Sequence, residues 1–501
     1  MDASGQPARF AVAIIGSGFG GLGMAYYLKQ AGIEDFVILE KAQNVGGTWR
    51  ENTYPGAACD VPSHLYSYSF EPHYPWSNRY APQSEILAYI QHCARKYGIE
   101  PHIRFGAEVR AAEFDDARGL WVVTLANGER IEADTVVSAV GQLHRPAIPR
   151  IKGLDSFQGR MFHSAHWDHD YDLDGKRVAV IGTGASAIQF VPAIAPKLKR
   201  MDVYQRSPGW IISKLDRKFS RFERWLLDTF PMLHDIDRAR IYWMTEALGY
   251  AYAGHTWAEQ LVTAFSKMQF YVQLRDPALR RKLIPNYRIG CKRILLTRDW
   301  LPTLARPNVE LVTDDVAEIT ETGVRSADGR TREVDAIIFG TGFAATQFLT
   351  PMRVSGRGGI DLHETWKDGA EAYLGMAVSG FPNFFMLYGP NTNVGSGSII
   401  FMLECQQRYI VRMLQQRRAQ KMGPVEVKAG AQSAYVQEIL QRSAKTTFEG
   451  GCHSWYTTES GRNTNNWIGL MGEFKRRTAE PVMSDYQVVT QAQPSTKAVA
   501  A

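Results

Sequence analysis

The chain has 501 residues, 45% hydrophobic and 22% charged, which is the composition of an ordinary globular protein with room for two or three domains. Lys and Arg number 57 against 51 Asp and Glu, and the resulting charge of +6 suits phosphate-bearing cofactors but is too weak to indicate nucleic acid. Five scattered cysteines without metal-type spacing, and no apolar run of about 18 residues, predict reduced thiols, a cytoplasmic location, no metal and no transmembrane segment.

The first predicted elements are a strand at residues 10–15, a glycine turn and a helix. The turn contains Gly16, Gly18 and Gly21, which permit a tight turn, close approach of a pyrophosphate and close helix–strand packing. The phosphates then lie at the helix N-terminus, where free N–H groups favour negative charge. The next strand ends in Glu40, whose carboxylate can accept hydrogen bonds from a ribose and repels a 2′-phosphate. This unit is therefore predicted to bind an unphosphorylated adenosine, such as that of FAD.

The same pattern returns at residues 177–187, where a strand is followed by Gly182, Gly184 and an alanine in the third small position. The strand after it ends at Arg206, which stands 24 residues after Gly182, as Glu40 stands 24 residues after Gly16. An arginine in that position can pair with a 2′-phosphate and predicts NADP rather than NAD. The alternative is an arbitrary surface arginine.

Two later segments, 134–141 and 335–342, each read as an acid, a strand and a glycine turn, and such strands return the chain to each nucleotide unit. They predict an α/β fold with two Rossmann-type dinucleotide-binding domains, the NADP domain being inserted into a discontinuous FAD domain. One unit that prefers an unphosphorylated adenosine and one that prefers a 2′-phosphorylated adenosine are typical of an enzyme that passes hydride from NADPH to a flavin. We place the FAD domain at 1–145 and 335–485, the NADP domain at 146–213 and 285–334, a helical insertion at 214–284, and a disordered tail at 486–501, most clearly from Gln491.

The helical insertion is rich in aromatic residues, as in FERWLLDTF and IYWMTEALGYAYAGHTW. It is interpreted as a substrate-covering subdomain, an interfacial patch for lipophilic substrates, or a set of residues that simply pack in a core. We expect core packing for most of these side chains.

Two gapped motifs make the pattern specific. Residues 157–168 (FQGRMFHSAHWD) match FxGxxxHxxxW(P/D), and residues 46–60 (GGTWRENTYPGAACD) match (A/G)GxWxxxx(F/Y)P(G/M)xxxD. The chain thus resembles the flavin-dependent Baeyer–Villiger monooxygenases over residues 11–467. The sister N- and S-oxygenating flavin monooxygenases usually carry Phe or Tyr at the position of Trp167. A non-catalytic NADP-binding scaffold is a further alternative, whereas a disulfide reductase requires a CxxC that the chain lacks. The linker fingerprint comprises Phe157, Gly159, His163, Trp167 and Asp168.

The resemblance implies that NADPH reduces FAD, that O2 adds at the flavin C4a, and that the peroxide attacks a hydrophobic ketone. The tetrahedral adduct then rearranges to an ester or lactone, and sulfoxidation of thioethers is expected as well. This chemistry requires a fixed cation that stabilises an oxygen anion in a site from which water is excluded. We expect a monomer or a weak homo-oligomer.

The resemblance implies that Arg293 is this cation, because a guanidinium stays protonated at any working pH, and that Asp60 orients it. Lys292 is expected to help Arg206 hold the 2′-phosphate. The alternatives are a solvated basic pair at 292–293, a turn-capping role for Asp60, and a structural linker role for His163.

The resemblance also implies a set of cofactor contacts. The expected FAD-binding residues are Gly16, Gly18, Phe19, Gly21, Glu40, Gly47, Thr48, Trp49, Asp60, Tyr66 and Val109. The expected NADP-binding residues are Thr183, Gly184, Ala185, Ser186, Gln189, Arg206, Ser207, Lys292, Arg293 and Trp455.

Near the C-terminus, a polar glycine loop at 388–397 precedes an apolar helix, and the N-terminus of that helix is expected to face the flavin. Residues 457–467 (TTESGRNTNNW) depart from the usual GlyAlaAsn-x-ProGly continuation of the family. This departure leaves Trp455 as either a nucleotide contact or a core residue.

Overall fold

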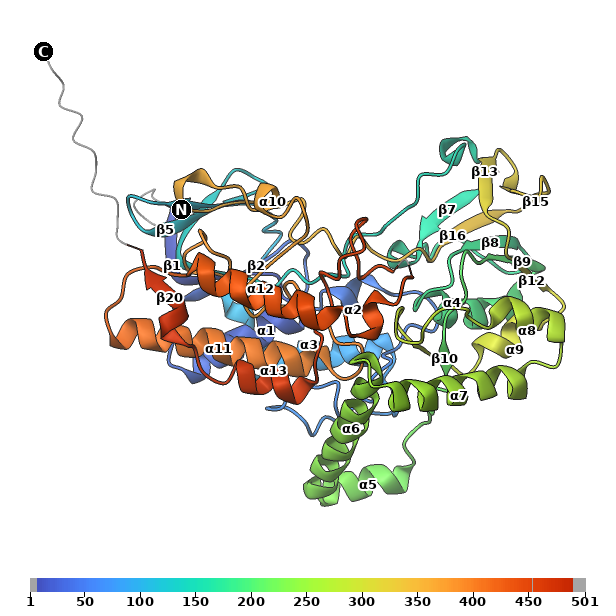
Figure 1. The fold of residues 1–501 in the computed structure, drawn as a ribbon, viewed down its shortest axis with the longest axis horizontal. Coiled ribbons are helices and arrows are strands. Elements are labelled where there is room, and N and C mark those ends of the chain that lie inside the picture. Colours follow the sequence, from blue (N-terminus) through green and yellow to red (C-terminus); the bar gives the residue numbers. More distant parts are fainter. Residues whose placement is uncertain (1–6, 453, 490–501) are drawn as a thin grey trace, which may run out of the picture.

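The computed structural model describes residues 7–452 and 454–489 (Figure 1). An eight-stranded mixed sheet carries the first glycine turn. Its hydrogen-bonded order is β17 (Arg353–Ser355), β4 (Val109–Asp115), β5 (Leu120–Leu125), β6 (Arg130–Ser138), β1 (Ala8–Ile15), β2 (Phe36–Glu40) and β3 (Ile103–Phe105), with β18 (Phe384–Met386) also pairing with β6. The central strand β1 is parallel to both of its neighbours, since Ile14 pairs with Ile38 and with Val137.

A second, five-stranded parallel sheet carries the second glycine turn. Its order is β12 (Val309–Val312), β9 (Arg200–Tyr204), β8 (Arg177–Ile181), β16 (Ala336–Phe339) and β7 (Arg160–His163). Here Val180 of β8 pairs with Val203 and with Ile338, which repeats the arrangement around β1. The α/β fold with two Rossmann-type units that the sequence predicted is therefore confirmed.

The second sheet is built entirely from residues that lie between β6 and β17 in the chain, so its unit is inserted into the first. The two linkers that join the units run alongside each other. Pro146 forms an antiparallel bridge with Phe343, the Ala147 N–H donates to the Gly342 carbonyl at 2.9 Å, and the Ala344 N–H donates to the Arg145 carbonyl at 2.9 Å. The residue bounds proposed for the domains stay a prediction.

Smaller sheets and helices complete the two units. The remaining strands are β10 (Ile211–Ile212) with β11 (Leu295–Leu296), β13 (Val316–Thr320) with β14 (Gly323–Ser326) and β15 (Thr331–Glu333), and β19 (Val425–Val427) with β20 (Tyr486–Val488). The α-helices outside the insertion are α1 (Phe19–Gln30), α2 (Thr48–Glu51), α3 (Gln83–Lys96), α4 (Ala187–Ile194), α9 (Trp300–Leu304), α10 (Leu362–Thr365), α11 (Ile399–Ala419), α12 (Ala429–Ser443) and α13 (Met471–Arg477).

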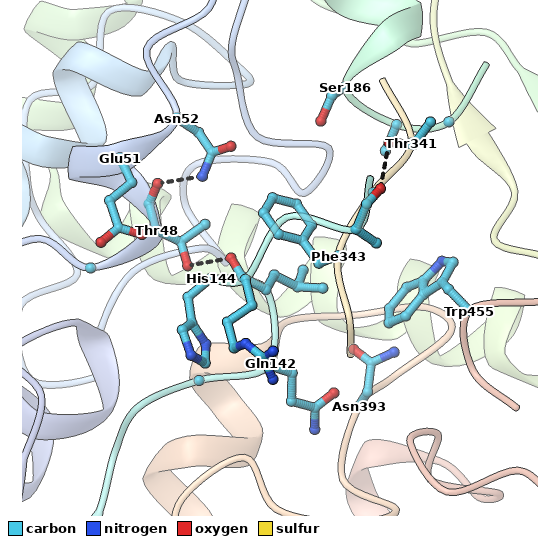
Figure 2. Close-up of a pocket in the computed structure, with 18 of the residues that line it drawn as sticks. Thr48, Glu51, Asn52, Gln142, His144, Ser186, Thr341, Phe343, Asn393 and Trp455 are labelled. Carbon is cyan, nitrogen blue, oxygen red and sulfur yellow. Dashed lines mark hydrogen bonds between the residues drawn. The ribbon is translucent and has the colours of Figure 1, made fainter. Parts of the chain in front are cut away.

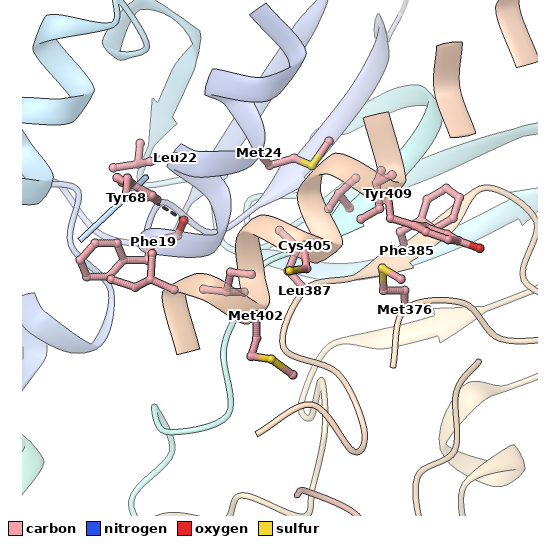
Figure 3. Packing of buried hydrophobic residues seen from close by; sticks show 14 of the residues in the cluster. Phe19, Leu22, Met24, Tyr68, Met376, Phe385, Leu387, Met402, Cys405 and Tyr409 are labelled. Atoms are coloured by element: carbon pink, nitrogen blue, oxygen red, sulfur yellow. Dashed lines mark hydrogen bonds between the residues drawn. The ribbon is translucent and has the colours of Figure 1, made fainter. Parts of the chain in front are cut away.

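The main core lies where α1 packs against α11 (Figure 3). Phe19, Leu22 and Met24 of α1 meet Met402 and Cys405 of α11 in one buried cluster. The close approach depends on Gly23, because a Cβ at that position would lie 2.5 Å from the Gln407 side-chain nitrogen. The amide of Gln407 in turn donates to the Gly20 carbonyl at 3.0 Å, so α11 holds the first turn of α1 in place.

The expected insertion is helical throughout, with α5 (Arg221–Thr229), α6 (Pro231–Tyr252), α7 (Thr256–Gln273) and α8 (Pro277–Leu283). Figure 1 shows α6 running away from the two sheets, with α5 at its far end. The expectation of core packing is wrong for many of its large apolar side chains, which are exposed to solvent. None of the helices in residues 7–452 and 454–489 combines the length and hydropathy needed to cross a membrane.

Two sequence-based expectations require correction. Cys291 and Cys452 form a disulfide, although they lie 161 residues apart in the sequence; Cys59, Cys93 and Cys405 are free and buried. The disordered tail does not begin at 486, because Tyr486–Val488 form strand β20 against β19, and the Tyr486 hydroxyl is hydrogen-bonded to the Tyr409 hydroxyl at 2.9 Å. The part of the expected tail from Gln491 onward lies outside the described residues.

Candidate functional site

A cleft of about 1240 Å³ lies between the two units, at the carboxyl ends of the central strands of both sheets. Its walls include the two glycine turns, the 46–60 segment, the linkers and the loop before α11. Figure 2 shows Phe343 of a linker between the side that carries Thr48 and Asn52 and the side that carries Trp455. In α/β proteins, the crevice outside the carboxyl ends of the strands is where nucleotide cofactors bind.

The first glycine turn leaves room for a phosphate group. Gly16 has φ +103°, and a Cβ there would lie 2.8 Å from the Ala139 carbonyl oxygen, so the turn requires glycine. At Gly18 an added Cβ would meet nothing closer than Gly47 Cα at 3.7 Å, so this position is open to the cleft. No side chain caps the N-terminus of α1, and its first turn carries no acidic residue. The first turn of α1 thus offers an uncompensated positive dipole end to an anion.

Glu40 lies at the end of β2, beside this turn, and is buried. One carboxylate oxygen accepts hydrogen bonds from the Ser17 backbone N–H at 2.9 Å and from the Ser17 hydroxyl at 2.7 Å. The other accepts from the Ala42 N–H at 2.9 Å and from Arg50 at 3.3 Å. The carboxylate is therefore fixed in orientation at the edge of the cleft, where it can accept a hydrogen bond from a sugar hydroxyl.

The second glycine turn repeats this geometry. Gly182 has φ +107°, and a Cβ there would lie 2.4 Å from the Gly340 carbonyl oxygen. In the first turn, a Cβ on Gly16 would approach the Ala139 carbonyl oxygen in the same way. Gly184 is open, with no neighbour of its Cβ position closer than 3.9 Å. No side chain caps α4 either. The two turns are thus equivalent anion-binding positions on opposite sides of one cleft.

Two cationic side chains, Arg206 and Lys292, lie beside the second turn, near the end of β9. The side chain of Arg206 is exposed, and the Lys292 ammonium donates to the Ser207 hydroxyl at 2.5 Å. Burial, and then the nearby charge of Arg206, lower the pKa of Lys292 from its usual value. Arg206, Lys292 and the Ser207 hydroxyl lie close together, and neither cation forms an ion pair with an acid among the described residues, which suits a phosphate.

Arg293 and Asp60 form an ion pair within the cleft. The guanidinium donates through Nε at 3.0 Å and through Nη2 at 2.6 Å to the same carboxylate oxygen. The Asp60 charge raises the pKa of Arg293 despite the opposing effect of burial. Burial opposes ionisation of Asp60 as well, but the charge and hydrogen bonds of Arg293 hold the pKa of its carboxyl below the usual value. The pair therefore stays charged at neutral pH, with its remaining N–H groups free to point into the cleft.

The 46–60 segment is joined directly to the second unit through Gln189 of α4. The Tyr54 hydroxyl donates to the Gln189 side-chain oxygen at 3.0 Å, and the Gln189 amide donates to the Ala58 carbonyl at 2.9 Å. Trp49 in the same segment donates to the Tyr66 hydroxyl at 3.0 Å. The segment that ends in Asp60 is thus held by both units, and so is the position of the ion pair.

The loop before α11 is supported by the atypical C-terminal segment. The Asn391 N–H donates to the Thr464 carbonyl at 2.8 Å, and the Asn393 N–H donates to the Asn465 carbonyl at 2.9 Å. Asn465 is fully buried, and its side-chain amide donates a hydrogen bond to the side-chain oxygen of Gln142, in a linker, at 3.0 Å. The departure of residues 457–467 from the family pattern therefore builds an amide network under this loop. The N-terminus of α11 carries no side-chain cap, and Gly397 and Ile399 line the cleft; that it faces the flavin stays a prediction.

The predicted cofactor residues lie together. All of the expected FAD-binding residues except Gly21 line the cleft, and so do all of the expected NADP-binding residues, including Trp455. Gly21 instead packs against the turn, since a Cβ there would lie 1.9 Å from the Gly16 carbonyl oxygen. The cleft is also lined by residues outside these sets, among them Gln142 and, in the 388–397 loop, Tyr388 and Asn393; the Tyr388 hydroxyl donates to the Asn393 side-chain oxygen at 2.7 Å. Buried amides and hydroxyls of this kind leave no periodic signal in a sequence.

The 157–168 fingerprint lies elsewhere, and none of its five described fixed residues lines the cleft. Trp167 packs against Phe162 and Phe190. The His163 side chain accepts a hydrogen bond from the Ala165 N–H at 3.1 Å and caps a short helical turn, while burial lowers the pKa of its imidazole to about 4. Asp168 accepts from Arg160 at 2.5 Å. These contacts favour the structural interpretation of the fingerprint, at the base of the inserted unit.

Comparison with known proteins agrees with this geometry. Residues 9–355 match the family described as flavin-binding monooxygenase-like. The chain is 46% identical to a Baeyer–Villiger monooxygenase of Streptomyces coelicolor over 98% of this chain and 95% of that protein. Among solved structures, it is similar to an oxidized steroid monooxygenase bound to NADP (TM-score 0.86, 29% identity, 97% of this chain and 100% of that one). It is also similar to OTEMO in complex with FAD and NADP (TM-score 0.85, 26% identity, 96% and 100%).

Proposed function

The chain belongs to the flavin-binding monooxygenase-like family, and from that membership we propose that its cleft binds FAD and NADPH and inserts one oxygen atom of O2 next to the carbonyl of a hydrophobic ketone. The product is the corresponding ester or lactone. The enzyme is an NADPH-dependent flavin monooxygenase of the Baeyer–Villiger type. The observation that carries the proposal is the Arg293–Asp60 ion pair, which lines one cleft together with two glycine turns, one beside Glu40 and the other beside Arg206.

The residues of the first turn fit FAD. The open position at Gly18, the uncapped start of α1 and the fixed carboxylate of Glu40 supply, in order, space for a pyrophosphate, a positive dipole end and a ribose acceptor. The uncapped start of α11 also borders the cleft, where it can stabilise negative charge on a reduced flavin ring.

The residues of the second turn fit NADPH. Gly184 leaves the pyrophosphate position open, and Arg206, Ser207 and Lys292 supply two cations and a hydroxyl for the 2′-phosphate. Trp455 lies in the same wall and is proposed as a contact of the nicotinamide nucleotide. Gln189 lines this part of the cleft too, but its amide is already used to hold the 46–60 segment.

When bound, FAD reduced by NADPH supplies the activated oxygen. Arg293 contributes a charge that does not titrate in the working range, and it stabilises negative charge that develops on the ketone oxygen. Asp60 is a positioning residue: it fixes the guanidinium plane by two hydrogen bonds to one oxygen. Cofactors and a hydrophobic ketone that filled the cleft would displace water from around this pair, which would strengthen the electrostatic contribution.

The test is a panel of cyclic and linear ketones with the purified flavoprotein, NADPH and O2, with products scored by mass spectrometry for a gain of one oxygen. We expect esters or lactones from hydrophobic ketones, with NADPH consumption that rises on ketone addition, and some sulfoxide from a thioether run in parallel. Oxygenation of the thioether or of an amine with no ketone converted would instead place the enzyme with the N- and S-oxygenating monooxygenases. The hydrophobic ketone, the monomeric or weakly oligomeric state and the cytoplasmic location stay predictions.

A further inference from the structure

The inserted helices carry most of the exposed large apolar side chains of the protein. Of the twenty-one that are exposed in the described residues, sixteen lie between 215 and 272. Trp243 is 68% exposed, Trp257 63% and Trp225 55%. The sixteen are Leu215, Phe222, Trp225, Phe230, Met232, Leu233, Ile236, Trp243, Met244, Tyr250, Trp257, Leu261, Phe265, Met268, Tyr271 and Val272. Such a concentration of exposed apolar side chains in one segment indicates an interaction site rather than ordinary surface composition.

The exposed residues form stripes of helical spacing. In α7, Trp257, Leu261, Phe265 and Met268 repeat at intervals of three and four on the solvent side, whereas the face that contains Ala258 and Phe270 packs in the core of the second unit. Helix α7 is therefore apolar on two faces, only one of which is used within the molecule.

Helices α6 and α5 continue this surface. Ile236, Trp243 and Tyr250 form the outward stripe of α6, and the Tyr250 ring lies 6.3 Å from the Trp257 ring of α7, which joins the two stripes. In α5, the ring of Phe222 stacks on the ring of Trp225, with 5.8 Å between the ring centroids. In Figure 1, α6 and α5 extend away from the sheets, whereas α7 runs alongside the second unit. The name apolar arm is used below for the sixteen residues together.

Charged residues on the same helices are distributed unevenly. Three of the acids are paired within the molecule: Glu223 with Arg217, Asp237 with Arg79, and Glu259 with Arg288. Asp235 contacts only His73, and exposed Asp228 and Asp276 take part in no ion pair among the described residues. Within the described residues seven exposed cations of this region take part in no ion pair: Lys218, Arg221, Arg224, Lys267, Arg275, Arg281 and Lys282. The apolar arm is thus bordered by free positive charge.

Helical position places some of these cations at the edge of the apolar stripes. Lys267 borders the α7 stripe, one turn from Tyr271, and Arg221 and Arg224 share the exposed side of α5 with Trp225. Exposed tryptophan and tyrosine, adjacent aliphatic side chains and flanking Lys and Arg are the composition of a helix that lies in the interface of an anionic bilayer. Two copies of a cation-bordered surface repel each other, so a symmetric dimer through the arm is disfavoured.

From this combination we infer that the apolar arm docks the enzyme on an anionic phospholipid surface. The aromatic rings enter the boundary between headgroups and acyl chains, and the free cations contact the anionic headgroups. The inference is separate from the cleft chemistry, because none of the sixteen apolar side chains lines the cleft described above.

The test is flotation of the FAD-loaded protein with vesicles of phosphatidylcholine alone and of phosphatidylcholine mixed with phosphatidylserine. We expect binding to the mixed vesicles, a blue shift of tryptophan emission on binding, and weaker binding at high salt. The triple variant Trp225→Ser/Trp243→Ser/Trp257→Ser and the variant Lys218→Gln/Arg221→Gln/Arg224→Gln/Lys267→Gln should each bind about tenfold more weakly or worse. Both variants change exposed residues, so the flavin content and ketone conversion in solution should be unchanged.

Matched controls are Ile360→Ser/Val482→Ser, which removes exposed apolar side chains elsewhere, and Arg353→Gln/Lys367→Gln, which removes exposed cations elsewhere. Equal loss of vesicle binding in these controls would overturn the inference. So would absence of binding to either vesicle, and sedimentation velocity then identifies the alternative: a concentration-dependent dimer that the tryptophan variant abolishes would make a second copy of the chain the occupant.

Discussion

The guanidinium of Arg293 and the carboxylate of Asp60 come from segments 233 residues apart, and two guanidinium nitrogens contact one carboxylate oxygen at 3.0 and 2.6 Å. The second carboxylate oxygen makes no hydrogen bond to Arg293, and Nη1 of the guanidinium is not used in the pair. The cation is therefore oriented while part of its hydrogen-bonding capacity stays available to a ligand in the cleft.

Replacing Arg293 by Ala should separate flavin reduction from oxygen transfer. Loss of one fixed donor to a developing oxyanion costs about 2.7–4 kcal/mol, so ester formation should fall by roughly 10²–10³ while NADPH still reduces the flavin and hydrogen peroxide is released. Asp60→Ala should reduce ester formation less strongly, because the positive charge of Arg293 remains and only the orientation of its guanidinium is lost. Stopped-flow flavin reduction, product yield and peroxide release measure the three quantities. An Arg293→Ala enzyme with unchanged ester per NADPH contradicts the assigned role.

Arg206→Ala should weaken the binding of NADPH and leave the binding of NADH almost unaffected. One charged contact to phosphate contributes about 1.5–3 kcal/mol, so KM for NADPH should rise about 10- to 150-fold. Lys199→Ala, an exposed lysine before the same strand, is the matched control. Steady-state kinetics with both coenzymes provide the measurement, and equal effects on the two coenzymes would exclude a 2′-phosphate contact.

Gly18→Val should yield protein without flavin. The Cβ position of Gly18 faces open cleft space near Gly47, and a branched side chain there would fill the place proposed for the pyrophosphate. The purified variant should lack the flavin absorption band yet keep its circular dichroism. Gly430→Ala in α12, where an added Cβ meets nothing within 4 Å, should stay yellow. Stoichiometric flavin in Gly18→Val would refute the phosphate position.

His163 should make the protein less stable in mild acid. Its pKa in the folded protein is lowered to about 4, so between about pH 4 and 6.5 the unfolded chain takes up a proton that the folded one does not, and stability falls as pH falls. The slope is about 1.4 kcal/mol per pH unit at most, or about 2 kcal/mol between pH 7 and 5.

His163→Asn should reduce this loss, since the amide oxygen can still accept from the Ala165 N–H and cannot titrate. Urea unfolding of the flavin-loaded protein at pH 5 and 7 gives the difference, and His166→Asn, at an exposed neighbouring position, is the control. The same pH dependence in wild-type and His163→Asn protein would assign the acid sensitivity to other groups.

Non-reducing thiol titration of the denatured protein should find three thiols, since Cys291 and Cys452 are joined. Cys291→Ser should lower the free energy of unfolding by about 2–4 kcal/mol. It should also raise KM for NADPH, because the bridge ties the residue before Lys292 to the segment that carries Trp455, while flavin content should not change. Five thiols in the wild-type protein would remove the disulfide from the description.

The two glycine turns, Glu40 and Arg206 could be predicted because each is a backbone or charge requirement at a fixed distance along the chain. The disulfide could not be predicted, since its two cysteines lie 161 residues apart and only the folded structure brings them together. The role of Asn465 was equally hidden, because a buried amide network has no sequence period. For α7, apolar residues on two faces give the same pattern whether one face or both are buried, which is why the exposure of the apolar arm was missed.

The paired linkers also bear on how the two units move. Because Pro146 bridges Phe343 and backbone hydrogen bonds join the two linkers around that bridge, a rotation of the inserted unit would take place about one paired hinge and not about two independent linkers. Gln189 of the inserted unit is hydrogen-bonded to the 46–60 segment of the first unit, so it is a second connection that such a rotation would strain. A rotation of the second glycine turn relative to the first would therefore have to break the Tyr54–Gln189–Ala58 contacts, and it would act on the segment that ends in Asp60.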